Sequence, residues 1–101
     1  MVLDSVDWGK PVLSLVSRFR DVDRSRPAVL IVRHSEVNYR TVDDLIPAEL
    51  TERGEEAARE FGSRLPADLS YTMYHTAFTR TRQTTEEMAT GLESNGARVS
   101  F

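Results

Sequence analysis

The sequence contains no cysteine, which excludes disulfide bonds and thiolate metal sites and fits a reducing compartment. It also lacks any apolar stretch that approaches the roughly 20 residues needed to span a bilayer. The chain starts with MVLDSVDWGK, which has neither the basic start nor the long apolar run of a signal peptide. We therefore expect a cytoplasmic protein that has no membrane partner.

An excess of basic residues is missing as well. The 13 Lys and Arg residues are outnumbered by 16 Asp and Glu residues, so the net charge of −3 gives no reason to expect a nucleic-acid partner. No P-loop, dinucleotide fingerprint or metal-ligand spacing occurs, so we expect no cofactor and no metal. A chain of 101 residues allows one domain with a single modest core.

The chain does contain alternating helical and strand patterns. Residues 1–10 are typical of an extended or poorly ordered lead-in, and helical spacing from Pro11 makes residues 1–27 an N-terminal extension with a helix. The continuous apolar run from Ala28 to Val32 predicts a strand buried on both faces. The remaining predicted elements are a short helical turn around 43–46, a helix after the N-cap Thr51 that Pro66 ends, a strand at 69–74, a helix at 79–92 with Gly91 and Gly96 at its stop, and a strand opening in 97–101. This order predicts an α/β fold.

Basic side chains follow two of these strands. Arg33 and His34 come directly after the first strand, and Arg80 opens the helix that follows the second. Because the carboxyl ends of parallel strands meet at one edge of a sheet, these groups should converge on one crevice. Arginine binds two phosphate oxygens at once, and a neutral imidazole can attack phosphorus to form phosphohistidine. The pattern therefore indicates a phosphate site.

Three stretches, in order, resemble the signature segments of the histidine phosphatase superfamily, the phosphoglycerate-mutase-like enzymes. They are VLIVRHSEV, LTERGEEAAREFGSRL and HTAFTRTRQTTEEMA, and together they cover roughly residues 28–92. The resemblance implies that His34 is the phosphorylated nucleophile and that Arg33 and Arg80 bind the phosphoryl group. It also implies a three-layer open sheet, truncated here after the second crossover helix, with residues 28–101 as the N-terminal half of the domain.

Several positions depart from the family pattern. Ser35 stands where glycine is usual, and its hydroxyl has the chemistry to donate to a phosphate oxygen. Val37 and Arg40 disfavour a phosphoglycerate mutase. Outside the predicted nucleophile and phosphate ligands, we interpret Glu36 as a loop residue that fixes the site arginine or the backbone. Arg82 we interpret as a surface residue. For His75 the sequence favours two interpretations equally: a structural residue at the strand end and a member of the pocket.

The predicted function is hydrolysis of a phosphomonoester, on a phosphorylated small molecule or a phosphoprotein, through phosphohistidine at His34. In the family, a second histidine and an acidic proton donor come from segments downstream of those matched here. We therefore expect this chain alone to be weak or inactive without its missing half. The alternative is a phosphate-binding or interaction module that has lost catalysis. An unfinished sheet edge also favours self-association into a homo-oligomer.

Overall fold

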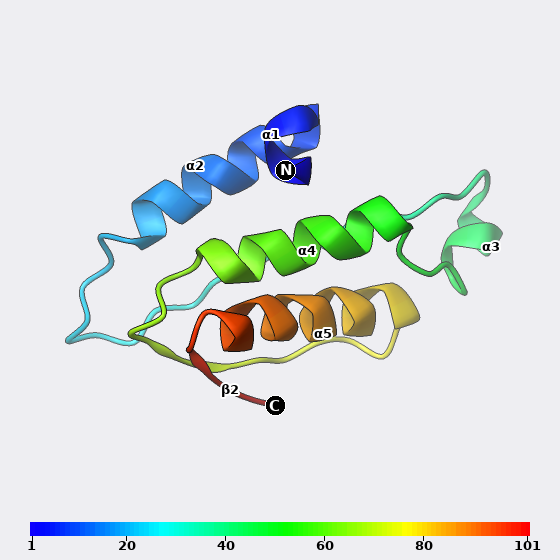
Figure 1. Ribbon diagram of the computed structural model, residues 1–101. Coiled ribbons are helices and arrows are strands. Elements are labelled where there is room, and N and C mark those ends of the chain that lie inside the picture. Colours follow the sequence, from blue (N-terminus) through cyan, green and yellow to red (C-terminus); the bar gives the residue numbers. More distant parts are fainter.

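The computed structural model describes residues 1–101, which form short N-terminal helices, two long helices and a small sheet (Figure 1). In chain order the elements are α1 (Val2–Ser5), the 3₁₀ turn η1 (Asp7–Gly9), α2 (Lys10–Phe19), α3 (Val42–Leu45), α4 (Glu52–Arg64), β1 (Ser70–Thr72), α5 (Thr79–Ser94) and β2 (Arg98–Ser100). None of these helices combines the length and the apolar character that crossing a membrane requires.

The core lies between α4 and α5, which run side by side (Figure 1). Ala57, Ala58 and Phe61 of α4 face Met88 and Leu92 of α5, and all five side chains are buried. These residues lie at helical spacing in the sequence, so the predicted apolar stripes are confirmed.

The end of α5 corrects one prediction. Gly91 does not stop the helix but lies inside it, buried where a Cβ would overlap the carbonyl oxygen of Arg59 in α4. Its lack of a side chain is needed for close approach of the two helices, which sequence position alone does not reveal. The helix runs on to Ser94, and Gly96 follows it with a φ of 92°, as expected of a glycine after a helix end.

The N-terminal extension is helical almost from its first residue, so the predicted extended lead-in over residues 1–10 is wrong. Leu3 and Val16 are buried in the same core as α4 and α5. The Leu3 backbone N–H also donates to Oε1 of Glu60 in α4 at 3.1 Å. Short helices gain their stability from such tertiary contacts, which composition does not show.

The sheet contains two parallel strands, β1 and β2, in register from Ser70 opposite Arg98 to Thr72 opposite Ser100. Both strands were predicted, and the mixture of helices with a parallel sheet is an α/β arrangement. The predicted buried strand at Ala28–Val32 is absent: Val29 is 85% exposed and Ile31 is 88% exposed. No neighbouring strand pairs with this run, and an apolar run becomes a buried strand only when a partner and covering layers are present.

The loop between residues 37 and 50 carries α3 away from the helix pair (Figure 1). An isolated antiparallel bridge between Val37 and Leu50 closes the base of this loop. Thr41 caps α3 by accepting the Asp44 N–H at 3.3 Å. The predicted helical turn is confirmed, one residue earlier than expected.

Candidate active site

The three signature-like stretches meet in space at Ser35 and Glu36. The Ser35 N–H donates to Oγ1 of Thr84 in α5 at 2.9 Å, and the Ser35 hydroxyl donates to the Gly54 carbonyl of α4 at 2.7 Å. The Thr51 N–H donates to the Glu36 carbonyl at 2.9 Å. Segments far apart in the chain are thus joined around the residues that directly follow His34.

The first turn of α4 is shaped to receive this segment. Thr51 is the N-cap, as predicted, and its Oγ1 accepts the Gly54 N–H at 2.9 Å. A Cβ at Gly54 would overlap the Glu36 carbonyl oxygen. Glycine at this position therefore lets residues 35–36 approach the helix backbone closely.

His34 is half-buried, and its ring orientation is set by one hydrogen bond. Nδ1 lies 2.8 Å from the carbonyl oxygen of Ser35. Because a carbonyl can only accept, Nδ1 carries a proton, and in the neutral form of the ring the lone pair lies on Nε2. No hydrogen bond of the chain involves Nε2, which makes it the available nucleophilic atom of the ring.

His34 lies on the wall of an open groove of about 610 Å³. Arg33 lines the same groove and takes part in none of the ion pairs of the chain. An unpaired guanidinium of this kind is a group that can bind an anion. The complete lining is Leu3, Trp8, Pro11, Val12, Leu15, Ile31, Val32, Arg33, His34, Ser35, Glu36, Val37, Tyr39, Ala57, Ala58, Phe61, Thr84 and Met88.

Glu36 is the one carboxylate of the groove lining, and it is already engaged. It forms an ion pair with Arg53 and accepts the Thr51 hydroxyl at 2.7 Å. The Arg53 guanidinium, with a smaller contribution from Thr51, holds the pKa of Glu36 below its ordinary value against the opposing effect of burial. Glu36 therefore suits a fixing role rather than proton donation, but the arginine that its carboxylate holds is Arg53 and not one of the predicted phosphate ligands.

Arg80 does not line the groove. Its Nη1 donates to the Leu45 carbonyl at 2.9 Å, and its guanidinium carbon lies 4.4 Å from the centroid of the Phe78 ring. Its Nε is buried without a hydrogen-bond partner. The Arg80 guanidinium is thus bound to the loop that carries α3. The Arg80 backbone carbonyl accepts a hydrogen bond from the Thr84 hydroxyl at 2.8 Å. The role of Arg80 as a phosphate ligand stays a prediction.

The other polar residues singled out in the sequence have defined positions. Arg82 is exposed and pairs with Glu86 at 2.6 Å, so its surface interpretation is confirmed. His75 is exposed and lies outside the groove lining, although its Nδ1 sits 2.7 Å from the next carbonyl, as in His34. The Ser35 hydroxyl is taken up by Gly54 instead of being free for phosphate.

Two contributors to the site were missed. Thr84 was given no role from the sequence, but it joins the Ser35 N–H to the Arg80 carbonyl. Its position four residues after Arg80, on the same helix face, was an available signal. The contribution of α1, η1 and α2 to the groove wall was also missed. The helical spacing of apolar residues after Pro11 could have indicated it, because such a face needs a packing partner.

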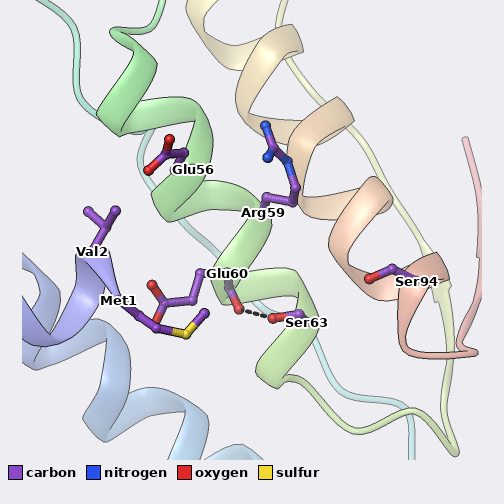
Figure 2. A pocket seen from close by; sticks show the side chains of 7 residues that line it. All are labelled: Met1, Val2, Glu56, Arg59, Glu60, Ser63 and Ser94. Atoms are coloured by element: carbon purple, nitrogen blue, oxygen red, sulfur yellow. Dashed lines mark hydrogen bonds between the residues drawn. The ribbon is translucent and has the colours of Figure 1, made fainter.

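A second hollow, of about 340 Å³, lies between the start of the chain, α4 and the end of α5 (Figure 2). Two of its charged side chains are already paired, Arg59 with Glu87 at 2.7 Å and Glu60 with Arg64 at 2.9 Å. We assign no chemistry to it. It is lined by Met1, Val2, Glu56, Arg59, Glu60, Ser63 and Ser94.

Comparison with known protein families matches residues 29–98, more than half of the chain, to the histidine phosphatase superfamily (branch 1). The matched span contains Arg33, His34 and Arg80, and it begins after the N-terminal extension. Comparisons with curated proteins and with solved structures give no match.

Proposed function

The chain belongs to the histidine phosphatase superfamily, and we propose that it takes the phosphoryl group of a phosphomonoester onto Nε2 of His34. Membership of this superfamily indicates phosphoryl transfer or hydrolysis as the reaction class. The observation that carries the proposal to a residue is the hydrogen bond from Nδ1 of His34 to the Ser35 carbonyl. In the neutral ring this bond places the lone pair on Nε2, and Arg33, which forms no ion pair, lines the same groove.

The proposed reaction has two steps. The Nε2 lone pair forms a bond to phosphorus while the phosphorus–oxygen ester bond breaks, and the bonding electrons stay on the leaving oxygen, which takes a proton from solvent. Water then attacks the phosphohistidine and breaks the phosphorus–nitrogen bond, which releases inorganic phosphate and restores the neutral ring. Arginine stabilises the charge on the equatorial oxygens in both steps.

Arg33 and Arg80 are the proposed phosphoryl ligands. Arg33 needs no rearrangement, because it already borders the groove beside His34. Arg80 has to exchange the Leu45 carbonyl for a phosphate oxygen. Its buried Nε, which has no partner, supports this exchange, because a buried donor gains from a new acceptor.

The run Ala28–Val32, which pairs with no other segment here, indicates how the complete phosphatase domain is built. We infer that this run becomes a strand of the three-layer open sheet once a neighbouring strand is supplied. In that unit, residues 28–101 are the N-terminal half of the phosphatase domain and residues 1–27 are an added extension. The substrate is then a phosphorylated small molecule or a phosphoprotein that reaches His34 through the groove.

A second candidate function is phosphate binding without turnover. The engagement of Glu36 by Arg53 and Thr51 favours it, because no other carboxylate lines the groove to act as a proton donor. A chain of this kind binds the phosphoryl group through Arg33 without forming phosphohistidine.

The test is intact mass after incubation with p-nitrophenyl phosphate, quenched without acid because the phosphorus–nitrogen bond is acid-labile. We expect one added phosphoryl group, which is lost in His34→Ala. His75→Ala is the matched control, since its Nδ1 makes the same local bond but the residue lies outside the groove. It should keep the adduct.

Three outcomes separate the candidates. An adduct that depends on His34 and not on His75 supports the phosphatase. An adduct in both variants contradicts the assignment to His34. No adduct in a chain that is folded by circular dichroism, together with phosphate binding that Arg33→Ala abolishes, supports the binding module instead.

A further inference from the structure

Ser35, the residue after His34, is hydrogen-bonded to both long helices. Its N–H donates to Oγ1 of Thr84 in α5 at 2.9 Å, and its hydroxyl donates to the Gly54 carbonyl in α4 at 2.7 Å. The carbonyl of the same residue lies 2.8 Å from Nδ1 of His34. The orientation of the His34 ring therefore depends on how the Ser35 backbone is held.

Thr84 connects this backbone to the segment of the second proposed phosphoryl ligand. Its side chain is buried, and its hydroxyl is used twice: the oxygen accepts the Ser35 N–H, and the hydrogen goes to the Arg80 carbonyl at 2.8 Å. A hydroxyl engaged as both donor and acceptor fixes its two partners relative to each other. Thr84 thus joins the segment of His34 to the turn of α5 that carries Arg80.

We propose that Thr84 is a positioning residue, which acts through the Ser35 backbone to keep the proton of the neutral His34 ring on Nδ1. The inference rests on the proposed function for the reaction that His34 performs. Loss of the Thr84 hydroxyl leaves a part-buried Ser35 N–H without an acceptor, so the segment moves to find another. That movement takes the Ser35 carbonyl away from Nδ1, and either ring nitrogen can then carry the proton.

Thr85 provides a matched control on the same helix. It is 8% exposed, against 5% for Thr84. Its hydroxyl donates to the Thr81 carbonyl at 2.9 Å, which is the same bond, one turn back along α5, that Thr84 makes to Arg80. Thr84→Val and Thr85→Val therefore remove the same atom and the same intrahelical bond. Only Thr84→Val also removes the acceptor of the Ser35 N–H.

The first measurement is the tautomer of His34, read by nitrogen NMR of the isotope-labelled imidazole at a pH where the ring is neutral. We expect the Nδ1–H form to predominate in the parent chain. In Thr84→Val the ratio of the Nδ1–H form to the Nε2–H form should fall about threefold to tenfold, the range that one net hydrogen bond supports. Thr85→Val should keep the parent ratio, and Thr84→Ser, which retains the hydroxyl, should restore it.

The second measurement is the rate at which p-nitrophenyl phosphate phosphorylates His34. Only the form with its lone pair on Nε2 attacks phosphorus in the proposed reaction. The rate in Thr84→Val should therefore fall at least as far as the fraction of the Nδ1–H form falls. A rate equal to that of the parent chain would overturn the positioning role.

Hydrogen exchange of the Ser35 amide needs no variant, so it tests the inference even if Thr84→Val does not fold. Thr76 is the reference, because it follows the exposed His75 and its N–H makes no hydrogen bond within the chain. After correction for intrinsic rates, the Ser35 amide should exchange at least about tenfold more slowly than that of Thr76. Equal exchange would show that Thr84 does not hold the segment.

The outcomes distinguish failure of this inference from failure of the proposed function. An unchanged tautomer ratio in Thr84→Val, or an equal change in Thr85→Val, overturns the positioning role and leaves the proposed function to the adduct of the parent chain. Failure of Thr84→Ser to restore the ratio also overturns it. Absence of phosphorylation in the parent chain overturns the proposed function, and the tautomer and the amide exchange then decide the positioning role alone.

Discussion

At the residue scale, the sequence located side chains of the candidate site better than it indicated their hydrogen-bond partners. His34 and Arg33 were identified from an apolar run that ends in charge, and both line the groove. Their neighbours depend on contacts across the fold, such as the Ser35 N–H to Thr84 bond. A spacing of 49 residues between those partners leaves no local pattern in the sequence.

Glu36 gives a prediction for stability against pH. Arg53 holds its pKa below the ordinary value of 4.5, so its contribution to folding is present above that pH and is lost as pH falls through the folded-state pKa. Glu36→Gln should lower the free energy of unfolding at pH 7 by about 1–2 kcal/mol. The difference from the parent chain should disappear below the folded-state pKa in urea titrations.

Glu93→Gln is the control for that titration, because Glu93 is exposed and its side chain forms no ion pair. Its stability profile should follow the parent chain throughout. A pH profile of Glu36→Gln that runs parallel to the parent's would show that the Arg53 pair does not stabilise the fold.

At the element scale, patterns within a single segment predicted the helices correctly. The predicted strand at Ala28–Val32 did not form, because a strand depends on pairing with another segment. Thr51 capping and the stripe through Ala57 and Phe61 lie within α4 itself, so the sequence contains them. A strand at Ala28–Val32 requires hydrogen bonds to another segment, which its own residues do not specify. The same reason explains why the inside position of Gly91 was missed: the contact it permits belongs to α4.

Gly91→Ala tests the α4–α5 contact. The new Cβ would overlap the Arg59 carbonyl oxygen, so the helices must separate, and we expect a loss of at least about 2–3 kcal/mol in the free energy of unfolding. Gly96→Ala is the contrasting glycine variant: it meets no atom within 4 Å but sits at φ 92°, so it should cost only about 1 kcal/mol. Equal costs in chemical denaturation would contradict the close-contact interpretation.

At the scale of the whole molecule, Ala28–Val32 leaves backbone groups and apolar side chains open to a second chain. Val29 and Ile31 are almost fully exposed, and unpaired apolar segments of this kind add strands from other molecules. The sequence-based prediction of a homo-oligomer rested on an unfinished sheet edge; we propose that self-association, if it occurs, uses the exposed run Ala28–Val32 instead.

Val29→Lys should shift the chain toward monomer in sedimentation velocity at concentrations where the parent chain associates. A lysine at this position costs desolvation and charge repulsion in any paired strand. Val42→Lys, a 74% exposed position on α3, is the matched control and should leave association unchanged. Equal association of both variants with the parent would place the contact elsewhere.

The bond between Leu3 and Glu60 also bears on the order in which the chain folds. It joins residues 57 apart, whereas α4 and α5 are neighbouring helices whose contacts need a much shorter loop to close. Closing the longer loop costs more entropy, so the helix pair should form first and the extension should dock last. Until α4 has formed, the elements α1, η1 and α2 of the extension contact only one another, and the groove beside His34 is completed only at that final step.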